Sequence, residues 1–219
     1  MKEKTIEIVK KYAYPFTISL IVIAYQAIIY FLAKFTPFQE HIIGSTLDSK
    51  IPFIPIFIIP YVLWYLFLVV VPCVLYSQDK KTFYQYITTN ILVDTVATII
   101  FIFYPTLLIR PEIAVDSVST WIVNLIYWGD TPALNCFPSV HCANCFVAIF
   151  IMAKSNKIRN KGRFFTILFG ILIIFSTLFV KQHAVIDVVG ALFLATFIVF
   201  VVKEFHLETF LEKRLEKKC

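Results

Sequence analysis

The chain has 219 residues, of which 59% are hydrophobic and only 16% are charged, and its net charge is +6. A water-soluble domain of this size could not bury so much apolar surface, so the composition excludes an ordinary soluble protein. In a soluble protein the positive charge would indicate nucleic acid binding. Here membrane orientation explains it better, and no nucleic-acid partner is expected.

Long apolar runs separated by short charged segments predict an all-α, polytopic membrane protein with a bundle of six transmembrane helices. We expect residues 1–219 to form a single membrane-embedded domain. The second run contains several prolines and should be kinked, and the fourth and fifth are short for a ~30 Å hydrocarbon core. The expected spans are approximately Tyr14–Ala33, Phe53–Tyr76, Tyr84–Tyr104, Pro138–Ala153, Phe164–Val180 and Ala184–Val202.

Basic residues are unevenly distributed among the segments that join these runs. Most lie in the N-terminal segment, in the loops near residues 80 and 157, and in the C-terminal tail, whereas only Lys34, Lys50, Arg110 and Lys181 fall on the other side. Cytoplasmic loops of membrane proteins carry an excess of Lys and Arg, so both termini are predicted to be cytoplasmic. We expect an integral protein of a bacterial plasma membrane.

The segment from about residue 105 to 137 is then external, and it is too long to be a mere connection. Within it Val118, Trp121 and Leu125 repeat at helical spacing after Ser117, a suitable N-cap, which predicts a short amphipathic helix. This helix could be a lid packed on the bundle or a lipid-facing wall of a substrate entrance. The two interpretations are compatible, and both stay open.

His183 and Asp187 lie four residues apart at the expected outer start of the last span. This spacing places both side chains on one face of a helix. A carboxylate that bonds one imidazole nitrogen fixes the tautomer and leaves the other nitrogen free to attack. Taken alone, the pair is as consistent with a structural role as with catalysis.

Ser139 and His141 occupy the expected outer start of the fourth span, after Pro138. Proline suits the first turn of a helix, and the free N–H groups there, together with the Ser139 hydroxyl, could bind an anion. His141 would face the same space and could protonate a leaving oxygen. The Pro-Ser-x-His pattern is weak evidence by itself.

Arg110 and Lys181 are two of the few cations expected outside, and each lies near one of the histidines. Arginine binds phosphate as a bidentate fork, so we assign both cations to phosphate binding in preference to contacts with lipid headgroups. The combined groups would form a phosphoryl-transfer site that needs neither a metal nor another cofactor.

Over about residues 84–202 these pieces resemble the type 2 phosphatidic acid phosphatase superfamily. The matching motifs are Arg110-Pro111, Pro138-Ser139-Val140-His141 and Ser176…His183-Ala-Val-Ile-Asp187. The resemblance implies a six-helix bundle and a metal-free mechanism. It also implies site roles: a phosphohistidine-forming nucleophile (His183), the carboxylate that orients it (Asp187), a general acid (His141) and phosphate ligands (Arg110 and Ser139).

The chain lacks two cationic residues of the family pattern. Phe103 stands where the first motif has Lys, and Thr177 stands where the third has Arg, so Lys181 is a candidate replacement for one of them. Two segments, Tyr104-Pro105-Thr106 and Phe137-Pro138-Ser139-x-His141, look more like the branch that contains inositol phosphorylceramide synthases, which transfer a lipid phosphoryl headgroup to an alcohol. Asp130 and Asn135, in the loop before the second motif, could position that loop or contact a headgroup.

The favoured hypothesis is a lipid phosphatase that hydrolyses a lipid phosphomonoester or pyrophosphate at the outer face. A lipid phosphotransferase with an alcohol acceptor is the alternative with the same site. A third hypothesis is a non-catalytic lipid-binding or transport protein. It is supported by the absence of two cations that the family pattern has. In each case the expected partners are a lipid phosphate and membrane lipids.

Overall fold

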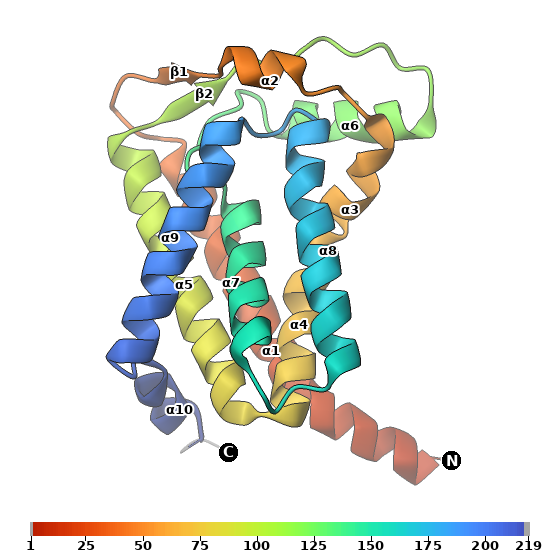
Figure 1. Cartoon of the computed structure of the whole chain (residues 1–219), viewed down its shortest axis with the longest axis vertical. Coiled ribbons are helices and arrows are strands. Elements are labelled where there is room, and N and C mark those ends of the chain that lie inside the picture. Colours follow the sequence, from red (N-terminus) through yellow and green to blue (C-terminus); the bar gives the residue numbers. More distant parts are fainter. Residues whose placement is uncertain (1, 217–219) are drawn as a thin grey trace.

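The computed structural model describes residues 2–216, which form a bundle of long helices joined by short elements (Figure 1). The predicted all-α class is confirmed for this part of the chain. The long helices are α1 (Lys2–Ala33), α4 (Trp64–Gln78), α5 (Lys80–Phe103), α7 (Val140–Lys154), α8 (Asn160–Phe179) and α9 (Val185–Glu204). The short elements are β1 (His41–Ile43), α2 (Thr46–Lys50), the 3-10 turn η1 (Pro55–Phe57), α3 (Ile58–Val62), β2 (Thr106–Leu108), α6 (Val118–Gly129) and α10 (Glu208–Glu216).

Five helical segments of the described chain are long and apolar enough to cross a membrane: Tyr12–Ala33, Pro55–Gln78, Lys80–Phe103, Asn160–Phe179 and Val185–Glu204. The fourth expected span is instead the 15-residue helix α7. At 1.5 Å per residue α7 rises only about 22 Å, which is short of a ~30 Å hydrocarbon core. The sixth crossing therefore stays a prediction.

Helix α7 lies at the centre of the bundle, where α5, α8 and α9 pack around it (Figure 1). Most of its side chains are buried, including the small residues Ala143, Cys145 and Ala148. Because protein surrounds α7, it does not need the length of a lipid-facing helix. Its N-terminal end, which carries the second motif, is thereby held within the protein.

The proline-rich second span, for which the sequence predicts a kink, is divided into the consecutive segments η1, α3 and α4. Pro55 begins η1, and Pro60 lies within α3, which a single residue separates from α4. Tyr61 in α3 and Trp64 in α4 lie on either side of this break, and the rings of both contact His141. The break thus contributes two aromatic side chains to the site.

The two ends of the bundle differ (Figure 1). One end carries both termini of the described chain, the turn between α4 and α5, and α10, whereas the opposite end carries α2, α6 and the two strands. The strands pair in parallel, with His41 opposite Thr106 and Ile43 opposite Leu108. Helices α7 and α9 both begin at this second end, which we call the site end. That it faces away from the cytoplasm stays a prediction.

Helix α6 is the amphipathic helix predicted for the long outer segment. It begins after Ser117, whose hydroxyl accepts a hydrogen bond from the Thr120 backbone N–H at 3.2 Å. Val123 is fully buried against the bundle, whereas Val118 and Trp121 are exposed. The helix therefore covers the site end with one face and presents an apolar surface with the other.

Candidate active site

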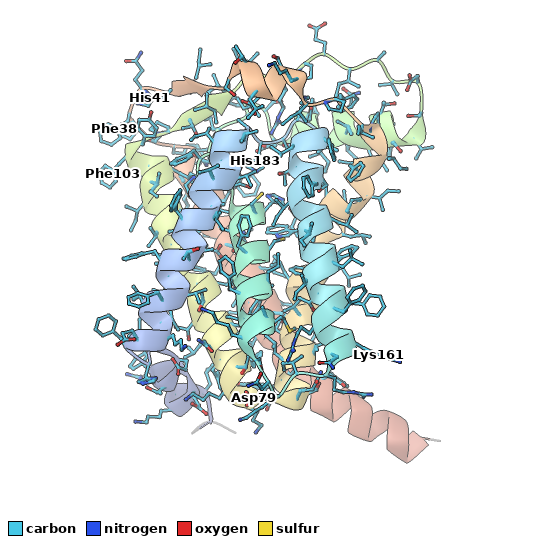
Figure 2. The ribbon with its side chains drawn as sticks, in the orientation of Figure 1. Phe38, His41, Asp79, Phe103, Lys161 and His183 are labelled. Carbon is cyan, nitrogen blue, oxygen red and sulfur yellow. The ribbon has the colours of Figure 1, made fainter. Side chains whose placement is uncertain are left out.

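His183 and Asp187 form a bonded pair at the start of α9. His183 Nδ1 lies 3.2 Å from Asp187 Oδ2, and the same oxygen accepts the Ala184 backbone N–H at 2.8 Å. The Asp187 side chain is fully buried, and that of His183 is 9% exposed. Because the carboxylate holds Nδ1, Nε2 is the nitrogen left to attack. Figure 2 shows His183 near the site end, far from Asp79 and Lys161 at the opposite end.

Backbone contacts join the second motif to the third. The Ser139 N–H donates to the Asp187 carbonyl at 3.1 Å. One turn further along α9, Phe137 packs so closely on Gly190 that a Cβ there would lie 2.3 Å from the ring. The Ser139 hydroxyl accepts the Cys142 N–H at 3.3 Å and caps α7. Ser139 is fully buried in this role and does not line the cavity described below.

His141 lies in the first turn of α7, and its ring centroid is 5.8 Å from that of His183. Tyr61 stacks on His141 at 4.8 Å, and the Trp64 ring lies 4.0 Å away. These aromatic contacts restrict the orientation of the imidazole. The separation of the two histidines leaves room for a phosphoryl group that one attacks while the other reaches the leaving oxygen.

A cavity of about 290 Å³ connects the two histidines with the rest of the site. Its polar wall includes Gln26, Arg110, Asp130, Asn135, His141, Gln182 and His183. Most of the remaining wall is apolar or aromatic and comes from α1, α3, α4, α6, the segment 134–136 and the start of α7. Phe31, Tyr65 and Leu125 belong to this wall and are also exposed on the surface of the bundle. Such a cavity suits a ligand with a polar head and an apolar chain.

Arg110 is held in the cavity wall from two sides. Its Nη2 donates to Asp130 Oδ2 at 2.6 Å and to Gln182 Oε1 at 2.5 Å, and Nη1 donates to the Asp130 carbonyl at 3.2 Å. The guanidinium also lies over the ring of Tyr127, 4.8 Å from its centroid. Burial raises the pKa of Tyr127 to about 12 although Arg110 acts to lower it, so the phenol is neutral. Arg110 therefore presents a fixed positive charge beside the histidines.

Asp130 is the centre of a charged cluster between α1 and the outer loop. Its Oδ1 accepts hydrogen bonds from Lys34 Nζ at 2.7 Å and from Tyr30 Oη at 2.9 Å, while Oδ2 binds Arg110. Asn135 Nδ2 donates to the backbone carbonyl of Tyr30 at 3.1 Å. Both residues that the sequence left undecided, Asp130 and Asn135, thus line the cavity and fasten the loop to α1.

Lys181 and Tyr104 are two further predicted site residues that, like Ser139, do not line the cavity. Lys181 has a left-handed backbone (φ 55°), and its ammonium donates to the carbonyl of Asp48 at 2.8 Å and to that of Ile51. Tyr104 stacks on His41 at 4.2 Å on the outer loops. The turn at Lys181 therefore directs its side chain toward α2 and away from the cavity, so its expected role as a replacement phosphate-binding cation stays a prediction.

The position of the missing first-motif lysine also lies away from the cavity. Phe103 is 65% exposed, and its ring packs against Phe38 with a centroid separation of 5.7 Å. Figure 2 shows both rings at the outer edge of the bundle, apart from His183. At this position the aromatic pair takes part in packing between the loop after α1 and the end of α5.

Several residues that line the cavity or contact the site were not predicted from the sequence. Gln182 could have been predicted, because it directly precedes the proposed nucleophile. Tyr61 and Trp64 could not have been predicted, because the second span was notable only for its prolines. Tyr30 and Lys34 at the end of α1 reach the site only through the three-dimensional packing of α1 on the outer loop.

Comparison with known families identifies the chain at the level of its superfamily. The family model of the PAP2 superfamily matches residues 83–210, which is more than half of the chain. The chain belongs to the PAP2 superfamily. Members are generally phosphatases or related phosphotransferases, and the family together with the apolar helices indicates an integral membrane protein. No curated protein and no solved structure gives a significant match.

Proposed function

We propose that this protein is a membrane lipid phosphatase that hydrolyses a lipid phosphomonoester or pyrophosphate through a phosphohistidine intermediate. One observation carries the proposal: His183, bonded to a buried carboxylate, and His141 line one cavity together with the guanidinium of Arg110. This set supplies a nucleophile, an acid and an anion-binding group. A purely structural histidine would not require the other two.

In the proposed mechanism the lone pair of His183 Nε2 attacks phosphorus, and the bond from phosphorus to the lipid oxygen breaks. His141, whose protonated form the negative charge of the bound substrate favours, gives its proton to the leaving alkoxide. Now neutral, His141 then accepts a proton from water, whose oxygen attacks the phosphohistidine and releases phosphate. Asp187 stabilises the imidazolium character that develops on His183. Fixed electrostatic contacts to the phosphoryl oxygens should supply much of the rate gain.

The cavity supports a lipid as the substrate. Its apolar wall includes Phe31 and Leu125, whose side chains are also exposed on the surface of the bundle. A lipid in the outer leaflet could therefore place its chain against α1 and α6 while its phosphate reaches the histidines. This route requires the site end to face away from the cytoplasm, as the distribution of basic residues predicts.

Transfer to an alcohol is the second candidate reaction, and the pairing of Arg110 with Asp130 favours it. The carboxylate lies between Arg110 and Lys34 and offsets one of their two charges, and neither Lys181 nor Phe103 lines the cavity. A weakly positive site suits a phosphodiester, which carries one negative charge, better than a doubly charged monoester. An alcohol would then take the place of water in the second step.

A substrate panel with purified protein tests the proposal and separates its two versions. Phosphatidate, prenyl pyrophosphates and phosphodiester lipids are supplied in detergent, with and without a lipid alcohol, beside the His183→Ala variant. Free phosphate indicates hydrolysis, and a new phosphodiester lipid indicates transfer. We expect His183→Ala to reduce turnover by about 10³-fold or more. Full activity of that variant, or no turnover of any substrate, would refute the proposal.

A further inference from the structure

Gln182 is a buried amide beside the proposed nucleophile. It directly precedes His183, lines the same cavity and is only 2% exposed. Thr177 stands where the superfamily motif has an arginine, and its carbonyl accepts the backbone N–H of Gln182 at 2.9 Å and that of His183 at 3.1 Å. The backbone that holds the nucleophile therefore also fixes Gln182.

The orientation of this amide follows from its partner. Arg110 Nη2 lies 2.5 Å from Gln182 Oε1. A guanidinium has only donors, so the oxygen of the amide must face it, and the NH₂ group must point elsewhere. Among the described residues Gln182 Nε2 is buried without a hydrogen-bond acceptor, and the same holds for Arg110 Nε. Two residues that line the cavity and bond one another thus each have a buried donor without an acceptor.

Buried donors without an acceptor are rare in folded proteins, because burial removes them from water. At this position the missing acceptor can be a ligand, since both residues line the cavity that holds His183. A phosphoryl group attacked by His183 brings oxygens that accept hydrogen bonds and gain charge as the reaction proceeds. The donors are therefore suited to an anionic ligand.

Given the proposed function, we infer that Gln182 donates a hydrogen bond from Nε2 to a phosphoryl oxygen in the transition state. It thereby serves in place of the arginine that the third motif lacks at Thr177. The left-handed turn at Lys181 explains why the amide and not the lysine takes this role: it sends the ammonium toward Asp48 and brings the next side chain into the cavity. The substrate is recognised by an oriented neutral donor beside a single guanidinium.

Two substitutions separate the donor from other roles of Gln182. Gln182→Met keeps the length of the side chain but removes the donor without adding charge. Gln182→Glu keeps an oxygen for Arg110 and replaces the donor with a second oxygen. Gln39→Glu makes the same chemical change on the exposed outer loop and serves as the matched control. Activity is normalised to the amount of folded protein, which thermal denaturation in detergent reports.

We expect both Gln182 variants to lower kcat by about 100-fold, as the loss of one oxyanion donor does in other enzymes. KM should change less than kcat, and orthovanadate, which mimics the five-coordinate phosphoryl group, should inhibit the variants at least tenfold more weakly. Gln39→Glu should behave as the unmodified protein. A kcat of Gln182→Met within threefold of the unmodified value, unchanged vanadate inhibition, or activity lost only in proportion to folded protein would overturn the inference. Absence of His183-dependent turnover in the unmodified protein would instead refute the proposed function.

Discussion

Asp130 and Arg110 form an ion pair of 2.6 Å in the wall of the cavity. The other oxygen of the same carboxylate binds Lys34 at 2.7 Å and Tyr30 at 2.9 Å, both from the end of α1. One side chain thus joins the first helix of the chain to the first motif. Because α1 lies outside residues 83–210, the family match does not cover this half of the site.

Substitution of Asp130 should impair substrate binding more than protein folding. Asp130→Asn removes the negative charge that holds Arg110 and Lys34, so the guanidinium loses its fixed position. We expect kcat/KM to fall by about tenfold, which corresponds to about 1.4 kcal/mol, mainly through a higher KM. Steady-state kinetics with the best substrate of the panel measures the change.

A double-mutant cycle with Lys34→Met shows whether Lys34 acts through the same carboxylate. If it does, the two effects on kcat/KM should depart from additivity by about 0.5–3 kcal/mol. Lys50→Met, at another outer lysine, provides the control and should be additive with Asp130→Asn. Additive effects of Lys34→Met would mean that the Lys34 contact is unimportant for the site.

Removal of the Asp187 charge should abolish most of the activity without unfolding the protein. Asp187→Asn is isosteric, but it no longer stabilises a positive charge on His183 and can favour the wrong tautomer. Such a change costs about 10⁴-fold in kcat in a serine protease triad, and we expect a loss of at least about 100-fold here. A kcat close to that of the unmodified protein would show that Asp187 serves only to cap α9.

Gly190 should tolerate no larger residue, because the Phe137 ring occupies the space of its missing Cβ. Gly190→Ala should reduce the free energy of unfolding by about 1–3 kcal/mol, as overpacking does in other cores. Activity should also fall, because Phe137 lies two residues before Ser139. Thermal denaturation in detergent measures the first effect. Phe137→Leu in the Gly190→Ala background should restore stability, and failure to do so would contradict the assigned contact.

The carboxylate of Asp48 should make stability dependent on pH. Burial acts to raise its pKa, but hydrogen bonds from Ser45 and from the Val185 backbone N–H, together with Lys181, bring the pKa below its ordinary value of 3.8. The folded protein therefore binds this proton less tightly than the unfolded chain. The stabilisation is present above about pH 4 and is lost as the pH falls through the folded value.

Asp48→Asn tests this by removing the charge at every pH. The variant should have a lower melting temperature than the unmodified protein at pH 7, and the difference should shrink below pH 4. Glu40→Gln, on an exposed part of the outer segment, is the control and should leave the profile unchanged. A difference in melting temperature that is independent of pH would mean that the Asp48 charge contributes nothing.

The motif spacing predicts the contact between His183 and Asp187 well, because the spacing is local and α9 has to begin nearby. It predicts Lys181 poorly. A residue two positions from the nucleophile would face it on a regular helix or strand, but the left-handed turn reverses its direction and brings in Gln182. Backbone conformation at one residue thus decided which side chain entered the cavity.

The contribution of α1 could not be predicted because it depends on packing between distant segments. Lys34 and Asp130 are almost a hundred residues apart, and neither stands in a motif. The length of α7 is a similar case. Composition predicts a membrane span at α7, but the structure surrounds this helix with other helices. It therefore does not need to be as long as the hydrocarbon core is thick.

The central claim is that His183 carries the phosphoryl group during turnover. Protein is mixed with a substrate labelled with ³²P in the transferred phosphoryl group, quenched within one turnover, and examined for protein-bound label that is stable to base and labile to acid. We expect such label on His183 in the unmodified protein and none in His183→Ala. Label at another residue, or turnover by the His183→Ala variant at the rate of the unmodified protein, would contradict it.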